Sequence, residues 1–267
     1  ETNLPSVNLF KLRYTYGLVG NDGISGPEDR FFYLSEVNLN NGGTGYNWGI
    51  NYNNYYNGYN INRYDNESVT WEVAEKANYG LEIGLFNKVT ILAEYFEEHR
   101  KNIYMERQYI PETMGLTTSI NSNIGEVKAK GIDISLDYNH AFSGDFYITA
   151  RGNFTYSTNE ILVNGEPEYQ NQNLSRIGQP INQQWGYIAE RLFIDEEDIA
   201  NSPEQFNGFG STNTYLPGDI KYKDVNEDGV INQLDQAPIG KPYVPEIVYG
   251  FGFSAVYKSL DFSIFMQ

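Results

Sequence analysis

The sequence has no cysteine and only two histidines among its 267 residues. Without thiols, the chain forms no disulfide, offers no cysteine nucleophile and binds no metal through thiolates. His99 and His140 lie near the ends of expected strands, and no nucleophile motif accompanies either of them. No pair of carboxylates is placed as glycoside hydrolysis would need it. We therefore predict that the protein is not an enzyme.

Basic residues are also scarce: 18 Lys and Arg stand against 35 Asp and Glu, which gives a formal net charge of −17. Binding to a phosphate backbone needs clustered Lys and Arg. The charge balance therefore excludes nucleic acid as a partner.

Long apolar runs are missing, since no stretch of about eighteen apolar residues occurs and a transmembrane helix is excluded. The chain opens without a basic segment followed by an apolar one, so we expect that a signal peptide was removed or that the chain begins within a longer protein. What the sequence does have is aromatic residues, with 23 Tyr and 15 Phe. Aromatic strands with polar partners suit a barrel that has lipid on one side and water on the other.

Alternation of apolar and polar residues dominates the chain. In one segment Ile132, Ile134 and Leu136 alternate with Asp133 and Ser135. Successive side chains of a strand point to opposite faces, so each such segment has one apolar and one polar face. The pattern predicts about seven strands, at residues 7–17, 70–85, 89–98, 124–138, 146–157, 247–257 and from 261 onward. A soluble β-sandwich alternates in the same way, and alternation alone leaves both folds open.

The lengths of the connections favour the barrel. Short links at about 86–88, 139–145 and 258–260 take turns with long polar stretches at about 18–69, 99–123 and 158–246. Outer-membrane barrels combine short periplasmic turns with long extracellular loops in this way, whereas compact soluble domains rarely hold such long loops. We therefore predict an all-β fold, a partial antiparallel transmembrane β-barrel with long extracellular loops. Bacterial barrels have an even number of strands, so an odd number predicts a fragment.

Four passages, in the same order along the chain, resemble SusC/RagA-type TonB-linked outer-membrane proteins. They begin at Leu12-Arg13-Tyr14-Thr15-Tyr16-Gly17, Asn66-Glu67-Ser68-Val69-Thr70-Trp71, Asn123-Ile124-Gly125-Glu126-Val127-Lys128 and Gly218-Asp219-Ile220-Lys221-Tyr222-Lys223. The resemblance implies that residues 1–267 are a C-terminal portion of a barrel of about 22 strands in the cell outer membrane, without its plug and last strands.

The resemblance also implies a function and partners. It predicts TonB-dependent import of oligosaccharides or peptides together with a SusD-like surface lipoprotein, with TonB engaged through the missing N-terminal part and outer-membrane lipid around the barrel. Two alternatives stay open. One is a non-transporting barrel subunit of a larger outer-membrane assembly, and the other is a soluble, calcium-binding adhesion or carbohydrate-binding β domain.

One segment has the spacing of a twelve-position calcium loop, with Gly229 at the sharp turn. Its expected oxygen ligands are Asp224, Asn226, Asp228, the Val230 carbonyl, Asn232 and Asp235. Ca²⁺ is favoured over Mg²⁺, which prefers to keep its waters. The alternative is an array of Asx turns without metal. In either case we expect this loop to fold one long extracellular segment.

Aromatic residues gather in the first long stretch, among Asn and Gly. Candidates for contact with a ligand such as a sugar ring are Trp48, Tyr52, Tyr55, Tyr56 and Tyr59. They could equally pack on neighbours or on a partner. In the third long stretch, Asp195-Glu196-Glu197-Asp198 is expected to open a short surface helix, because carboxylates favour helix N-termini.

Overall fold

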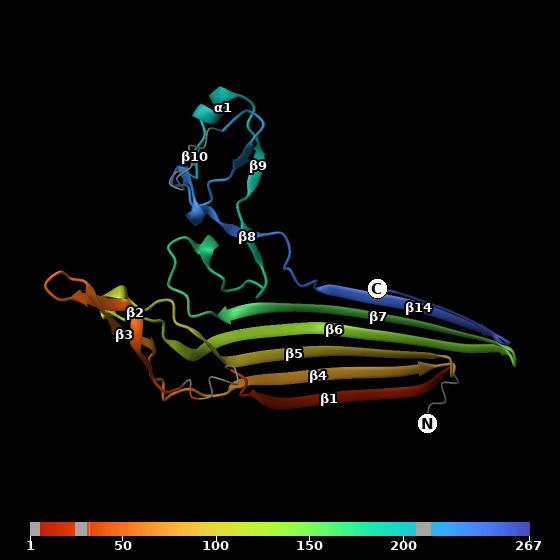
Figure 1. The fold of residues 1–267 in the computed structure, drawn as a ribbon. Helices are drawn as coiled ribbons and strands as arrows, with labels where there is room; N and C mark the ends of the chain where they lie inside the picture. The colour runs from red at the N-terminus through yellow and green to blue at the C-terminus, as the bar shows by residue number, and fades with distance from the viewer. Residues whose placement is uncertain (1–5, 25–30, 32, 207–214) are drawn as a thin grey trace.

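The computed structural model describes residues 6–24, 31, 33–206 and 215–267. Its main feature is one seven-stranded sheet in which every neighbouring pair is antiparallel (Figure 1). In spatial order its strands are β1 (Val7–Asn21), β4 (Glu72–Leu85), β5 (Val89–Glu106), β6 (Asn121–Ser143), β7 (Phe146–Val163), β14 (Ile247–Tyr257) and β15 (Leu260–Met266). The seven predicted strands are therefore confirmed as one up-and-down sheet.

Four strands, β1, β5, β6 and β7, are longer than predicted at the ends that meet the long connections, whereas β4 starts later than predicted, at Glu72. β5 continues to Glu106 and β6 starts at Asn121, so the connection predicted at 99–123 shrinks to 107–120. The connection predicted from residue 158 starts after Val163. The sequence pattern missed these ends because charged residues occupy both faces there, as in Glu97, Glu98 and His99.

Tight turns join the strands at the opposite end of the sheet, where β1 begins (Figure 1). Phe86 and Asn87, between β4 and β5, have φ angles of 54° and 53°. Two successive positive φ angles give the turn a twist that matches the flanking strands. The second turn, predicted at 139–145, is tighter than expected, because β6 runs to Ser143 and β7 starts at Phe146.

Among the described residues, neither face of the large sheet is covered by a dry core. The buried apolar side chains in the described ranges are Ala74, Ile161, Phe193, Ile231 and Ala237, and only the first two belong to the large sheet. The strands of a sandwich would bury one face against a second sheet. The soluble β-sandwich is therefore excluded. Within the described ranges no helix is long and apolar enough to cross a membrane.

All three long connections contain structure of their own, although the second holds only the short 3-10 helix η1 (Glu112–Met114). The first holds a hairpin of β2 (Glu36–Trp48) and β3 (Asn54–Arg63), which extends past the long-connection end of the sheet (Figure 1). The predicted loop 18–69 is thus partly β structure.

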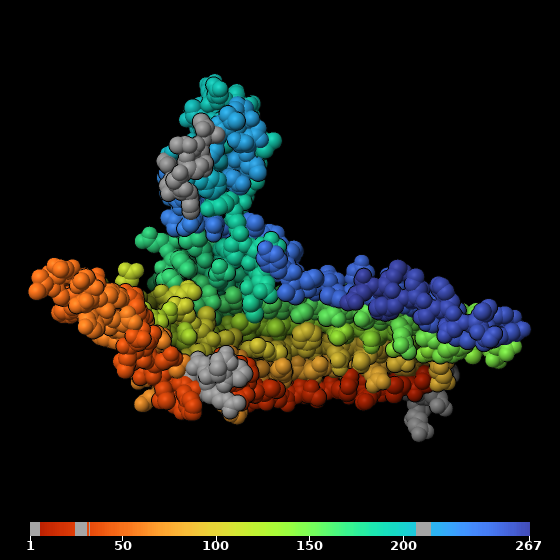
Figure 2. Space-filling model, in the orientation of Figure 1, coloured from red at the N-terminus to blue at the C-terminus, as the bar shows by residue number. Residues whose placement is uncertain are grey.

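The third long connection forms an insertion between β7 and β14, which rises from the sheet as a separate mass (Figure 2). Its elements are η2 (Gln172–Leu174), β8 (Gln184–Gly186), β9 (Ala189–Leu192), α1 (Glu196–Ala200), β10 (Glu204–Gln205), β11 (Ile220–Tyr222), β12 (Val230–Ile231), η3 (Gln233–Asp235) and β13 (Ala237–Ile239). Phe193 and Ile231 are buried in it.

Candidate functional site

One face of the large sheet carries a row of tyrosines across its strands. Tyr14 of β1, Tyr79 of β4 and Tyr95 of β5 lie opposite one another, with ring centroids 4.9 and 6.1 Å apart. The row continues through Ile132 of β6 to Tyr156 of β7. Tyrosine has an apolar ring and a polar hydroxyl, so such a row suits a boundary between hydrocarbon and water.

A second aromatic group lies on the same face at the turn end. The rings of His140, Phe142, Phe146 and Tyr257 follow one another at centroid distances of 4.2, 5.3 and 6.2 Å. On β6 the stretch from Ile132 to Phe142 spans about 33 Å of strand, which a tilt of about 40° reduces to about 25 Å. That height equals the apolar band of an outer-membrane barrel.

Aliphatic side chains fill the space between the two aromatic rows. Examples are Leu81, Ile91, Ile134 and Leu136, and Leu12 on β1 is 70% exposed. So much exposed apolar area, bounded by aromatic rows, needs lipid to cover it.

The opposite face carries ion pairs, most of which join different strands. Arg13 of β1 donates to Glu94 of β5 at 2.7 Å, and Glu98 of β5 pairs with Lys76 and Arg100 at 3.2 and 2.8 Å. These side chains are partly exposed, so each pair adds little to stability. Water on this face keeps both partners charged, as expected of a lumen wall.

Shallow hollows follow this polar face. One of about 300 Å³ contains Arg151, Thr149 and Ser254, and another of about 230 Å³ contains Glu98, Arg100 and Asn159. The polar face can therefore hold hydrated polar solutes through hydrogen bonds and charges.

The β2–β3 hairpin places the aromatic candidates on exposed surface. Trp48 ends β2, Tyr52 lies in the turn with φ 51°, and Tyr56 and Tyr59 on β3 are 63% and 68% exposed. Alternation along β3 sends Tyr55 and Tyr59 to one face and Tyr56 to the other. Tyr55 donates its hydroxyl to the Gly42 carbonyl within the hairpin. The predicted residues therefore form two aromatic surfaces and not one.

The predicted calcium loop is an array of side-chain-to-backbone hydrogen bonds. Asn226 Oδ1 accepts from the Asp228 amide at 3.1 Å, and Asp228 Oδ1 from the Val230 amide at 2.9 Å. Asp235 is fully buried and accepts from the amides of Val225 at 2.9 Å and Asn232 at 2.8 Å. Asn232 and Asp235 also cap the short helix Gln233–Asp235 reciprocally.

These contacts bear on the metal prediction. Asp224 Oδ2 accepts from the Gly229 amide at 2.8 Å, while its Oδ1 is buried without a hydrogen-bond partner. Across the described residues, no three Asp, Glu or His side chains converge as metal ligands do. The loop folds through its own hydrogen bonds, and bound Ca²⁺ stays a prediction.

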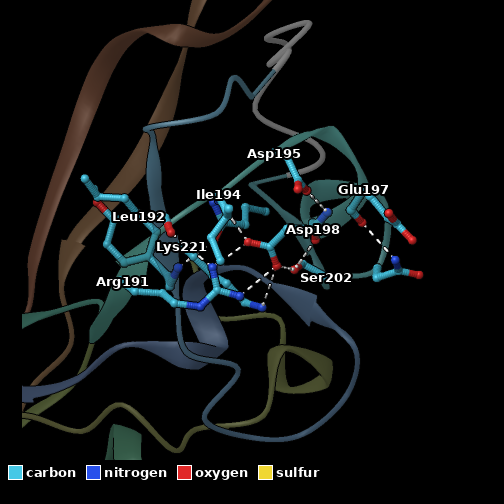
Figure 3. Close-up of polar contacts among 11 residues, drawn as sticks. Arg191, Leu192, Ile194, Asp195, Glu197, Asp198, Ser202 and Lys221 are labelled. Carbon is cyan, nitrogen blue, oxygen red and sulfur yellow. Dashed lines mark hydrogen bonds and ion pairs between the residues drawn. The ribbon is translucent and has the colours of Figure 1, made fainter.

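Asp198 in the insertion is the centre of a network of polar contacts (Figure 3). Sequence analysis did not predict this network. Arg191 of β9 donates to both oxygens of Asp198, and Lys221 of β11 lies 3.7 Å away. Arg191 and Lys221 face each other across the β9–β11 pair, so the carboxylate offsets the repulsion of two like charges. The predicted helix start is confirmed, since Asp195 accepts from the Asp198 amide at 2.8 Å.

The contacts of Asp198 hold its pKa well below the usual range. The largest cause is the hydrogen bond from Arg191, and the Ile194 amide adds to it at 3.1 Å. Asp198 therefore stays ionised and connects β9, α1 and β11. The partners lie far apart in the sequence, which is why no local pattern pointed to them.

Comparison with known proteins places the chain in a family. The family model "TonB dependent receptor-like, beta-barrel" matches residues 11–243. TonB-dependent receptor P3 of Formosa agariphila is 24% identical over 275 residues, which are 98% of this chain and 26% of that protein. TonB-dependent receptor SusC of Bacteroides thetaiotaomicron is 25% identical over 282 residues, which are 100% of this chain and 26% of that protein.

Solved structures show the same fold. The chain matches the RagAB peptide importer in its open-open state with a TM-score of 0.68 at 19% identity, over 98% of this chain and 26% of the matched chain. For the closed-closed state the TM-score is 0.64 at 21% identity, with coverages of 97% and 26%. The chain thus spans about a quarter of the length of these relatives.

Proposed function

Because the chain belongs to the family of TonB-dependent receptor-like β-barrels, we propose that it forms part of the wall of a nutrient importer. The family sits in the outer membrane and its members are transporters, not enzymes, so the predicted localisation and the absence of enzymatic activity hold. The observation that carries the proposal is a sheet with an apolar, aromatic-bounded face and an ion-paired, hydrated face.

We infer that the cargo is a peptide or an oligosaccharide. The RagAB structures are named as those of a peptide importer, which favours peptides. The polar wall carries both acids and bases, and such a surface solvates the charges and amides of a peptide. The exposed tyrosines of the hairpin suit either cargo, since aromatic rings pack against apolar side chains and sugar rings alike.

The proposed partners follow from the same relatives. A SusD-like surface lipoprotein would meet the long connections, and TonB would engage a part of the protein outside residues 1–267. The SusC relative and the RagAB structures support this arrangement.

Uptake by cells that carry the full-length protein tests the proposal. We expect labelled peptides, or labelled oligosaccharides, to accumulate in these cells and to stop accumulating in a strain without TonB. Unchanged uptake without TonB, or no uptake of either cargo class, would contradict import and favour a non-transporting subunit.

The hairpin is tested with two surface variants in the same uptake assay. Tyr59→Ser and Tyr56→Ser remove an exposed ring from opposite faces of β3. We expect the variant whose lost ring faces the cargo to raise the half-saturating cargo concentration several-fold. The variant whose lost ring lies on the other face should leave that concentration unchanged, and it serves as the matched control. Equal uptake by both variants and by the parent would remove the hairpin from the cargo path.

For the loop Asp224–Asp235 we propose bound Ca²⁺, supported by the buried, unbonded Oδ1 of Asp224. Ca²⁺ takes oxygen ligands and would give that atom a partner. We expect added Ca²⁺ to slow proteolysis within residues 184–239 of the full-length protein, and Asp224→Asn to abolish this protection. Identical cleavage with Ca²⁺ and with chelator would show that the hydrogen bonds of the loop suffice.

A further inference from the structure

On the apolar face of the large sheet, charged residues replace apolar ones directly beyond the row of tyrosines. One step toward the long connections, Glu97 of β5 faces Lys130 of β6, and the next step places His99 opposite Lys128 and Lys128 opposite Glu160 of β7. Two-residue steps keep these side chains on the face of Tyr95 and Ile132. They therefore lie on the lipid side of the wall, at the level of the outer-leaflet headgroups.

Most charges of this belt already have partners. Tyr95 donates its hydroxyl to Glu97 at 2.6 Å, His99 pairs with Glu126 at 3.1 Å, and Lys101 pairs with Glu75 at 3.0 Å.

Lys128 and Lys130 are the exception. Within the part of the chain that the structure describes, neither has an ion pair or a hydrogen bond from its side chain, although each faces a carboxylate across the sheet. Two exposed ammonium groups thus remain available at the headgroup level.

The two lysines line a built hollow of about 310 Å³. Thr158, Asn159, Glu160, Gly178 and Pro180 complete its wall. Backbone hydrogen bonds fix this wall, because the Gly178 amide donates to the Ile161 carbonyl at 2.8 Å and the Ile161 amide to the Gln179 carbonyl at 3.0 Å. The Ile181 amide adds a bond to Asn159 Oδ1 at 2.8 Å.

Glu166 holds the residues that come directly before Gly178 through hydrogen bonds. Its carboxylate accepts from the Asn164 side chain at 3.0 Å and from the Arg176 amide at 3.1 Å. Burial alone would raise the pKa of Glu166, but hydrogen bonds from Ser175, Asn164 and the backbone hold it below its usual value. The segment next to the lysines therefore keeps a defined shape.

We propose that this hollow binds a phosphate group of an outer-leaflet lipid. Two lysines and one glutamate give the hollow a formal charge of +1, on a chain whose net charge is −17. Lysine stems lie along apolar surface while their ammonium groups reach the headgroups. The Thr158 hydroxyl already donates to Glu246 Oε1 at 3.4 Å, so the two ammonium groups supply the donors for the phosphate. Basic side chains at a membrane surface attract anionic lipids. The inference depends on membrane placement and not on import, so uptake assays and lipid-binding assays can fail separately.

Lipid binding to the delipidated full-length protein in detergent tests the proposal. The probes are lipid A with its phosphates, dephosphorylated lipid A and inorganic phosphate. We expect Lys128→Gln with Lys130→Gln to weaken binding of phosphorylated lipid A about 30-fold, or about 5-fold per lysine. The matched control, Lys88→Gln with Lys223→Gln, removes the same charge at a periplasmic turn and in the insertion, and should leave the affinity unchanged.

Substitution of Glu160, the acid in the wall of the hollow, should have the opposite effect on lipid binding. A gain in affinity cannot come from a folding defect. Glu160→Gln raises the charge of the hollow and should tighten binding of phosphorylated lipid A several-fold. Equal affinities for the phosphorylated and dephosphorylated lipids would overturn the proposal. Binding of inorganic phosphate as tight as that of the lipid would also overturn it, since the site would then serve free phosphate.

Discussion

At the residue scale, Asp198 shows how one side chain organises a segment that has little apolar core. It accepts from Arg191 and from the Ile194 amide, it lies 3.7 Å from Lys221, and its own carbonyl accepts from the Ser202 hydroxyl at 2.6 Å. Bidentate pairing with a guanidinium is among the stronger geometries for an ion pair. The insertion thus depends on polar contacts more than a compact domain would.

We predict that Asp198→Asn loosens the insertion and makes it less sensitive to acid. The folded pKa of Asp198 is depressed, so its stabilisation is present above the unfolded pKa of about 3.9 and is lost as the pH falls through the folded value. Limited proteolysis between residues 184 and 239 should be several-fold faster in the variant at pH 7. The difference from the parent should narrow as the pH falls below about 4.

Glu196→Gln is the matched control, because Glu196 lies in the same helix. Equally fast cleavage of both variants would mean that helix charge, and not the contacts of Asp198, protects the insertion.

At the scale of the element, each long strand has one face suited to hydrocarbon and the other suited to water. On β6, Leu136 lies between Ile91 and Gly152 on the apolar face, and Ser135 lies between Leu92 and Asn153 on the polar face. Leu136 is close to mid-height between the two aromatic rows. Neighbouring residues on one strand therefore have opposite tolerance for charge.

We predict that Leu136→Arg destabilises the barrel by about 2–4 kcal/mol, the range for Arg at the bilayer midplane. Urea unfolding of the full-length protein in lipid vesicles measures the change. Ser135→Arg introduces the same side chain one residue away, facing water, and should change stability by less than about 1 kcal/mol. Similar losses for both variants would show that the apolar face does not meet hydrocarbon.

At the scale of the whole molecule, the described part of the chain provides no core that covers either face of the large sheet. Its apolar face is exposed and its polar face bears ion pairs and hollows. Hydrophobic burial, which stabilises most folds, must come here from lipid and from further strands. Free edges on β1 and β15 would pair with such strands, since closure leaves no edge open to hydrocarbon.

We predict that detergent alone releases the protein from membranes. High salt removes proteins held by charge, and a chelator removes those held through divalent cations, but neither replaces hydrocarbon around an apolar wall. Fractionation of washed membranes followed by immunoblotting measures the release. Recovery in the salt or chelator wash would contradict a membrane-spanning sheet.

The sequence alone determined the seven strands, their faces, the alternation of short and long connections and the family. These features are local, because alternation such as Ile132-Asp133-Ile134 reports on the solvent at each face and tight turns need only a few residues. The start of α1 at Asp195 was readable for the same reason.

Only the tertiary structure decided the full strand lengths, the β2–β3 hairpin, the split of its tyrosines between two faces, and the network of polar contacts around Asp198. It also showed that Lys128 and Lys130 line one hollow with Gly178 and Pro180, which lie about fifty residues further along the chain. Such contacts depend on register and on side chains from distant segments, whose pairing no local pattern encodes.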